Sequence, residues 1–216
     1  MGSLLYLAII AIQFTISLAS QGIPMKCLFR DSKSSNSFNS IKINPLNINH
    51  DGWILQVNDV NFLGMDNAIL DDFGFNFDTK VAHITFHTDM VITHNYKSDG
   101  TLFSKSIKGE GFTEVPIKNV QINMNMPFEI EKDGNKYFNL KDFDISYNIR
   151  DKAEFTFSNL YYGNKEESDT MHSLMNENWK YLTTEFGKYF FAEFGANLFE
   201  MFENYDSISL RNLSLC

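Results

Sequence analysis

The chain has 216 residues, of which 44% are hydrophobic and 21% are charged, a composition typical of one folded domain with a sizeable core. Its formal net charge of −9 argues against nucleic acid as a partner, because phosphate binding needs clustered Lys and Arg side chains. The same acidic balance disfavours electrostatic attachment to anionic lipid surfaces. We therefore expect a globular protein whose partner is neither nucleic acid nor a charged membrane surface.

An apolar run close to the amino terminus extends from about Leu4 to Leu18 and ends in small residues, with Ser17 and Ala19 placed before a cleavage point. This pattern predicts a secretory signal peptide over residues 1–19, cleaved near 19–20, and a single mature domain over residues 20–216. A membrane anchor is the alternative, but the run is shorter than the ~20 apolar residues that a spanning helix needs. We expect a secreted, extracellular protein without stable membrane insertion.

If the chain is secreted, its two cysteines and one sequon become candidate modification sites. Cys27 and Cys216 are the cysteines of the chain, and an oxidising environment makes them a candidate disulfide. Such a bond would join the two ends of the mature chain. Their spacing does not show that their Cα atoms approach closely, so both outcomes stay open. Asn212 begins an Asn-Leu-Ser sequon, which makes it a candidate glycosylation site.

From Trp53 onward, apolar and polar residues alternate with the period of two that is typical of half-buried strands. The pattern is clearest in AHITFHTDMVITHNY (82–96) and VQINMNMPFEIE (120–131), each with a continuous apolar face. Asp-Gly dipeptides predict hairpin turns at 98–100 and 132–135, so consecutive strands are expected to pair antiparallel.

Glycine and proline interrupt these strand-like segments. Gly109 and Gly111 favour a bulge, a bend or a close backbone approach. Pro127 has no N–H to donate, so its strand is expected to lie at a sheet edge or a bulge near that residue.

The period changes towards the carboxyl terminus. From about Ser168 to Asn204, apolar residues recur every three or four positions, as in an amphipathic helix. An unbroken helix of that length spans ~55 Å, whereas a compact sphere of the mature chain has a diameter of ~40 Å. Either Gly187 and Gly195 break the helix, or the molecule is elongated. We expect an elongated α+β fold, with a curved antiparallel sheet wrapped along a long C-terminal helix.

Motifs of the common enzyme classes are missing from the sequence. It contains neither Gly-x-Ser-x-Gly nor a phosphate-binding glycine loop. His83 and His87 would lie ~13 Å apart on a strand, too far to share a metal ion, so solvent-facing histidines are the simpler interpretation. The carboxylate pairs at 71–72 and 166–167 are interpreted as solvated charges. We expect no enzyme activity, metal or cofactor.

His94 is a different case, because it continues the apolar face of the strand around residues 82–92. A polar ring there needs a partner, which is a ligand, Tyr96, a backbone carbonyl or water. A histidine satisfied within the core is the more common situation, and a ligand contact is the alternative.

The order of several landmarks resembles the takeout and haemolymph juvenile hormone-binding protein family of the tubular lipid-binding superfamily. The landmarks are Pro45-Leu46 in INPLNI, Gly64 in VNFLGMDNAILDDF, then Tyr96, Gly100, Ile107, Gly109 and Gly111, and finally Asn159-Leu160, Gly163 and Asn176-Glu177-Asn178-Trp179. The likeness covers about Ile41 to Tyr205. Family chains usually carry two cysteines about ten residues apart near the mature N-terminus, followed by a short helix. Here Cys27 stands alone, so the chain resembles a short variant in which Cys216 is a candidate substitute partner.

The resemblance implies a long C-terminal helix wrapped by a highly curved antiparallel sheet, with an elongated apolar tunnel inside. It also implies a hydrophobic ligand such as a juvenile hormone-like terpenoid, a fatty acid or another lipid. Members of the family are secreted insect carriers of haemolymph or sensory tissue, and some take part in circadian or feeding behaviour.

Ligand contacts form no motif in the family, so the candidate tunnel lining is taken from the alternating faces of the strands and the helix. The candidates are Ile84, Phe86, Met90, Ile92, His94, Val120, Ile122, Met124, Met126, Phe128, Phe143, Ile145, Tyr147, Phe155, Phe157, Trp179, Phe186 and Phe190. The leading hypothesis is a secreted non-enzymatic carrier of a hydrophobic small molecule. The alternative is an extracellular protein-interaction module with the same fold and a collapsed cavity, which binds an extracellular receptor.

Overall fold

The computed structural model describes residues 22–26, 39–130 and 138–203. The expected signal peptide, the turn at 132–135, and the residues Cys27, Asn212 and Cys216 lie outside the described residues.

Two 22-residue strands form the centre of the sheet. They are β6 (Val81–Leu102) and β8 (Gly109–Ile130), which pair antiparallel from Val81↔Pro127 to Ser98↔Gly109. The expected turn at 98–100 is wrong, because Gly100 lies inside β6 and pairs with Trp53. A Cβ at Gly100, whose φ is 110°, would lie 2.1 Å from the carbonyl oxygen of Gly52, so a close backbone approach requires this glycine. The chain turns later, at Phe103 and Ser104, both with positive φ, before the short β7 (Lys105–Ser106).

Shorter strands follow the two outer edges of this pair. Along β6 lie β4 (Trp53–Leu63) and β5 (Ile69–Asn76), separated by the 3-10 turn η4 (Met65–Asn67); β2 (Ser40–Ile43) and β3 (Leu46–His50) pair with β4, and β1 (Ile23–Pro24) with β5. Along β8 lie β9 (Phe138–Leu140), β10 (Asp144–Ala153) and β11 (Thr156–Phe157). All of these pairings are antiparallel, and the described residues form one 11-stranded sheet.

Both prolines of β8 lie where its outer partner changes. Pro116 lies between the residues paired with Ala153 of β10 and Thr156 of β11. Pro127 lies between the residues paired with Asp144 of β10 and Leu140 of β9. A proline without an N–H costs no ladder hydrogen bond at such a break. The expectation for Pro127 is therefore refined: β8 is an inner strand, and the proline occupies a gap in its pairing.

The C-terminal helix is divided into three segments. They are α2 (Lys165–Glu177), α3 (Trp179–Glu185) and α4 (Gly187–Glu203), preceded by the 3-10 turn η5 (Tyr161–Gly163). The expected start at Ser168 is three residues late, because the side chain of Asn164 accepts a hydrogen bond from the N–H of Glu167 and caps the helix at Lys165. No helix of the described residues is long and apolar enough to cross a membrane.

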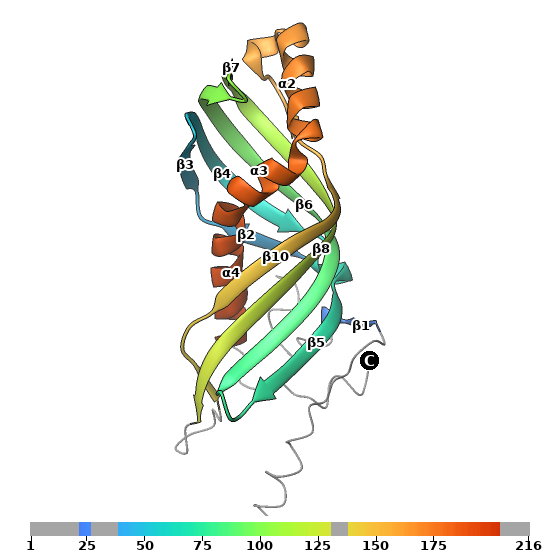
Figure 1. Cartoon of the computed structure of the whole chain (residues 1–216), viewed down its shortest axis with the longest axis vertical. Coiled ribbons are helices and arrows are strands. Elements are labelled where there is room, and N and C mark those ends of the chain that lie inside the picture. Colours follow the sequence, from blue (N-terminus) through green and yellow to red (C-terminus); the bar gives the residue numbers. More distant parts are fainter. Residues whose placement is uncertain (1–21, 27–38, 131–137, 204–216) are drawn as a thin grey trace, which may run out of the picture.

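The molecule is elongated, and its sheet curves around the helices (Figure 1). Helix α4 contacts β2 and β3 at one edge of the sheet and β10 at the opposite edge, so it closes the open side. Gly195 allows this contact, since a Cβ there would lie 2.9 Å from side-chain atoms of both Phe143 and Ile145. Of the two glycines expected to interrupt the helix, Gly187 follows a break and Gly195 lies inside α4.

The alternating faces of β6 and β8 form the core. On β8, Val120, Ile122 and Met124 are fully buried, and Met126 and Phe128 are at most 2% exposed. The inward side chains of β6 next to them, Ala82, Ile84 and Phe86, are buried against them. The curved antiparallel sheet and the C-terminal helices confirm the α+β architecture expected from the sequence.

Candidate ligand-binding cavity

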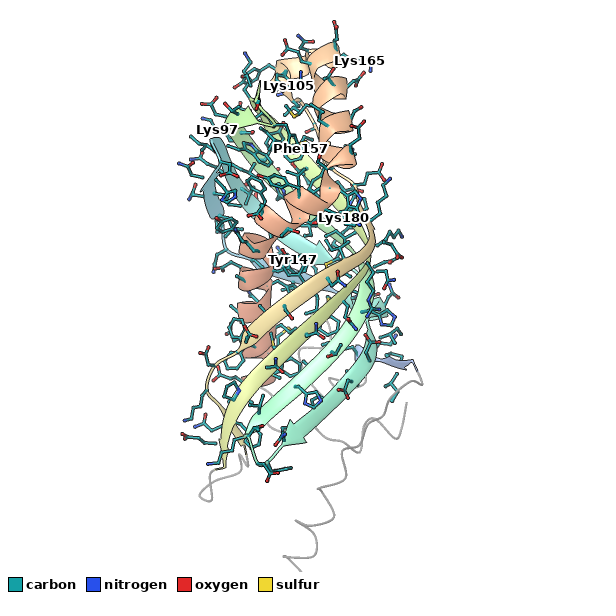
Figure 2. The ribbon with its side chains drawn as sticks, in the orientation of Figure 1. Lys97, Lys105, Tyr147, Phe157, Lys165 and Lys180 are labelled. Carbon is teal, nitrogen blue, oxygen red and sulfur yellow. The ribbon has the colours of Figure 1, made fainter. Side chains whose placement is uncertain are left out.

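An apolar cavity lies between the sheet and the junction of α3 with α4. Its volume is about 50 Å³. The lining residues come from β4, β6, β8, the segment around β11 and the two helices: Trp53, Leu55, Ile92, His94, Val115, Ile117, Phe155, Phe157, Leu182, Thr183, Phe186, Gly187, Phe190 and Phe191. No charged side chain belongs to this lining. Figure 2 shows Phe157 between strands and helices, in the upper half of the molecule.

Six of the residues predicted from the alternating faces lie in this lining: Ile92, His94, Phe155, Phe157, Phe186 and Phe190. The other candidates on β6 and β8 are buried core side chains away from the cavity: Ile84, Phe86, Met90, Val120, Ile122, Met124, Met126 and Phe128. Four more are half-buried against the core and also lie outside the lining: Phe143, Ile145, Tyr147 and Trp179.

The part of the lining that comes from β4 was not predicted from the sequence. Trp53 and Leu55 alternate with exposed Ile54 and Gln56, so the period of two already indicated that they face inward. On β8, Val115 and Ile117 continue the face that was predicted for residues 120–128, but a break in register with β6 separates the two stretches. In both places the alternation of residues indicates which side chains face inward. It does not indicate where along these faces the void lies.

Helix α2 positions the two phenylalanines of the cavity wall that come from the segment around β11. The side chain of Asn176 accepts a hydrogen bond from the N–H of Phe155 at 2.7 Å and donates one to its carbonyl oxygen at 3.2 Å. The N–H of Phe157 donates to Nε2 of His172 at 2.9 Å. Burial lowers the pKa of His172, which favours the neutral ring that can accept this bond. The backbone of the segment is thus fixed from the helix side.

The helical wall of the cavity contains the break between α3 and α4. Tyr147 on β10 donates its hydroxyl hydrogen to the carbonyl oxygen of Thr183, at 2.6 Å, where a continuous helix would use the N–H of Gly187. Burial raises the pKa of Tyr147 to about 12, so the hydroxyl remains a donor at neutral pH. A Cβ at Gly187 would lie 2.9 Å from that hydroxyl oxygen. A strand side chain therefore holds the junction of the two helices.

Aromatic rings dominate the cavity wall around Trp53. Its indole N–H donates to Oγ of Ser98 at 2.7 Å, and the side chain is only 3% exposed. The Trp53 ring lies 4.7 Å from that of Phe186 and 6.5 Å from that of Phe157. Because the hydrogen bond satisfies the one polar atom of the indole, Trp53 presents an apolar surface to the void.

His94 lies in the same wall and is 3% exposed. Its Nδ1 is 3.3 Å from the backbone carbonyl oxygen of Asn95, so a backbone carbonyl supplies one partner for the ring. The rings of Phe190 and Phe157 lie 5.5 Å and 6.4 Å from it. Burial among them lowers the pKa of His94 to about 4, and the imidazole is therefore neutral at physiological pH.

The histidines on the outer face of β6 have carboxylate partners. His83 Nε2 lies 3.0 Å from Oδ2 of Asp72, and His87 Nδ1 lies 2.6 Å from Oδ1 of Asp71. Asp71 also accepts a hydrogen bond from Nε2 of Gln121 on β8, at 3.0 Å. These contacts cross from β5 to β8 on the side of the sheet opposite the cavity. In the described residues, no group of three or more His, Cys, Asp or Glu side chains could hold a metal ion.

Comparison with known proteins identifies the family. The model of the haemolymph juvenile hormone binding protein family matches residues 12–210. The chain belongs to this family. Among solved structures, the crystal structure of Takeout 1 from Epiphyas postvittana is similar, with a TM-score of 0.72 and 26% sequence identity, over 76% of this chain and 76% of that one. No curated protein sequence matches the chain.

Three of the landmark residues of the family resemblance, Tyr96, Gly109 and Gly111, contact the segment next to Phe157 of the cavity wall. A Cβ at Gly111 would lie 2.5 Å from the carbonyl oxygen of Ser158, and one at Gly109 would lie 3.0 Å from that of Asn159. The hydroxyl of Tyr96 donates to the carbonyl of Ser158 at 2.8 Å. Of the bulge, bend or close backbone approach expected at these glycines, the structure shows the close approach, which lets the segment that carries Phe157 lie against β8.

Proposed function

We propose that this protein is a secreted, non-enzymatic carrier that binds a hydrophobic small molecule in the cavity beneath the α3–α4 junction. The observation that carries the proposal is an uncharged cavity with many aromatic lining residues in a chain of the haemolymph juvenile hormone binding protein family. Ligand sites are usually lined in this way, with few polar groups. Its ligand would be a juvenile hormone-like terpenoid, a fatty acid or another lipid.

The size of the cavity requires that it opens on binding. Sites for drug-sized ligands have volumes of about 300–1,000 Å³, whereas this cavity has about 50 Å³. Burying each CH2 group contributes ~0.8 kcal/mol, so a twelve-carbon chain supplies roughly 10 kcal/mol before the costs of association and opening. The α3–α4 junction is the wall best suited to move, because the helix is already interrupted there and Tyr147 supplies the hydrogen bond at the break.

The fluorescence of Trp53 offers a direct test. The chain has two tryptophans, and Trp179→Phe leaves Trp53 as the only one. Mature protein secreted from insect cells should retain extractable lipid in native mass spectrometry. Added dodecanol or a fluorescent fatty acid should change the Trp53 emission with saturation. Absence of retained lipid together with absence of any saturable change would refute the carrier function.

A matched pair of leucine variants locates the binding site. Leu182 lines the cavity and is 2% exposed, whereas Leu198 on α4 is fully buried outside the lining. Either substitution by Ala should destabilise the fold by about 2–5 kcal/mol. Only Leu182→Ala enlarges the cavity, so it alone should strengthen the binding of dodecanol. Equal effects of both variants on binding would place the ligand elsewhere.

The small volume of the cavity also favours a second function. A family member with a filled interior would serve as an extracellular protein-interaction module that binds a receptor. Such a protein should be secreted without bound lipid and should take up no hydrophobic probe. The folded protein should instead bind a partner from extracellular fluid through its surface. Saturable hydrolysis of a chromogenic ester by purified protein would contradict both functions.

Secretion and processing form part of the proposal. The apolar amino-terminal run supports removal of residues 1–19, and the sequon supports a glycan on Asn212. Amino-terminal sequencing of the secreted protein should begin near residue 20. Loss of mass on glycosidase treatment, absent from an Asn212→Gln variant, would establish the glycan. Non-reducing peptide mapping would show whether Cys27 and Cys216 pair.

A further inference from the structure

The cavity wall contains three side chains with polar atoms, and two of them have protein partners for their donors. The indole N–H of Trp53 donates to Ser98, and the hydroxyl of Thr183 donates to the carbonyl oxygen of Lys180 at 3.1 Å. The third is His94, whose Nδ1 contacts the carbonyl oxygen of Asn95. Within the described part of the chain, no hydrogen bond is made by Nε2 of His94. A polar atom of the interior without a partner is uncommon and costly. Unlike the fully buried Oγ1 of Thr113, which also has no partner, Nε2 belongs to a side chain that lines the cavity.

The contact at Nδ1 determines what Nε2 can do. A carbonyl oxygen only accepts hydrogen bonds, so Nδ1 carries the hydrogen of the ring. In a neutral imidazole the other nitrogen is then an acceptor. The lowered pKa of His94, about 4, keeps the ring in this neutral form at physiological pH. Nε2 of His94 is thus a ring-nitrogen acceptor in a side chain that lines a mostly apolar cavity.

We propose that Nε2 of His94 accepts a hydrogen bond from a hydroxyl group of the ligand, and that the cavity therefore selects a hydrophobic alcohol. This inference rests on the proposed carrier function and names the chemical class of its ligand. An ester, an ether or an epoxide has no hydrogen to donate and leaves Nε2 without a partner. A carboxylate places a negative charge beside a lone pair in an uncharged cavity, which is more costly still.

The neighbouring rings define where the hydroxyl lies. Phe190 on α4 and Phe157 beside β11 flank the imidazole, with ring centres at 5.5 Å and 6.4 Å from it. The alkyl chain of an alcohol bound to Nε2 then runs along the aromatic wall towards the α3–α4 junction. Because an unpaired acceptor in the interior costs about 1–3 kcal/mol, the alcohol should bind roughly 5- to 140-fold more tightly than an analogue without the hydroxyl hydrogen.

Three ligands that share the same twelve-carbon chain test the inference: dodecanol, its methyl ether and dodecanoate. Binding is measured by Trp53 emission in full-length mature protein that carries Trp179→Phe. Dodecanol should bind at least about fivefold more tightly than the ether, and dodecanoate should bind more weakly than dodecanol at neutral pH. His94→Leu should abolish the preference by weakening the alcohol towards the affinity of the ether. Leu55→Met, which changes an apolar residue of the same lining, should alter the affinities of alcohol and ether by the same factor.

The possible failures are distinguishable. Equal affinities of alcohol and ether in the wild-type background, or an unchanged preference in His94→Leu, would overturn the role of His94 while leaving the carrier function intact. Binding of none of the three ligands, with no retained lipid, would refute the carrier function itself. If His94→Leu does not fold, the 15N chemical shifts of the His94 ring in the wild-type protein, measured by nuclear magnetic resonance, show which nitrogen carries the hydrogen. Hydrogen on Nδ1 with a perturbed Nε2 on dodecanol binding supports the inference, and hydrogen on Nε2 overturns it.

Discussion

Protonation of His94 should make the stability of the fold depend on pH. The pKa of this side chain falls from 6.5 to about 4 on folding, because burial penalises the charged ring. As the pH decreases below 6.5, the unfolded chain binds a proton that the folded chain does not, so the free energy of unfolding decreases. The loss continues until the folded pKa is reached near 4 and then levels off. At 1.36 kcal/mol per pH unit, the 6.5-to-4 interval corresponds to about 3 kcal/mol.

The measurement compares wild-type protein with His94→Leu in urea unfolding between pH 4 and pH 8. Other groups titrate in both proteins, among them His172, whose pKa is also lowered by burial. The difference between the two unfolding free energies removes their contribution. This difference should be constant above about pH 7 and should shift by about 3 kcal/mol in favour of the variant as the pH decreases to 4. A difference that stays flat across the range would refute the burial of a neutral His94.

Three further substitutions address single contacts. Thr113 is fully buried with a hydroxyl that has no partner in the described structure, so Thr113→Val should raise the free energy of unfolding by about 1 kcal/mol, and a loss of stability in urea unfolding would contradict this. Gly100→Ala places a Cβ against the carbonyl oxygen of Gly52 at positive φ and should lower the free energy of unfolding by at least roughly 2 kcal/mol; a neutral effect would mean that the two strands separate there. Gly187→Ala should also be destabilising because of the Tyr147 hydroxyl, and part of that loss should disappear in the background of Tyr147→Phe. A double-mutant cycle should give a coupling of about 1 kcal/mol, and additive effects would exclude the contact.

The strands and their inward faces were predictable because their signal is local. On β6, the residues from Ala82 to Tyr96 alternate between inward and outward positions, and each inward side chain is buried. The turn at 98–100 was not predictable from its dipeptide. Gly100 is needed there for the close approach of Gly52, almost fifty residues earlier, and the chain turns instead at Phe103 and Ser104. Glycine is favoured both in tight turns and where two backbone segments approach closely, so its presence alone does not distinguish the two.

The break in the C-terminal helix was likewise not predictable from local sequence. Apolar residues at helical spacing continue from α2 to α4, so the sequence pattern does not mark the break at Phe186. The hydroxyl of Tyr147 satisfies the carbonyl of Thr183 at that break, and Tyr147 lies 36 residues away on β10. A break whose hydrogen bond comes from a distant strand leaves no trace in local periodicity.

The amino-acid sequence by itself determined the family resemblance, the curved antiparallel sheet and which face of each long strand points inward. Those properties follow from side-chain periodicity and from the order of landmarks along one chain. Only the tertiary structure decided where the interior is left unfilled, since a void depends on how β4, β6, β8 and the α3–α4 junction meet. It also decided that Met124 and Met126 belong to the packed core, while His94 faces the cavity with one nitrogen bound to a backbone carbonyl. Inward direction is a property of one strand, whereas the space in front of a side chain is a property of everything packed opposite it.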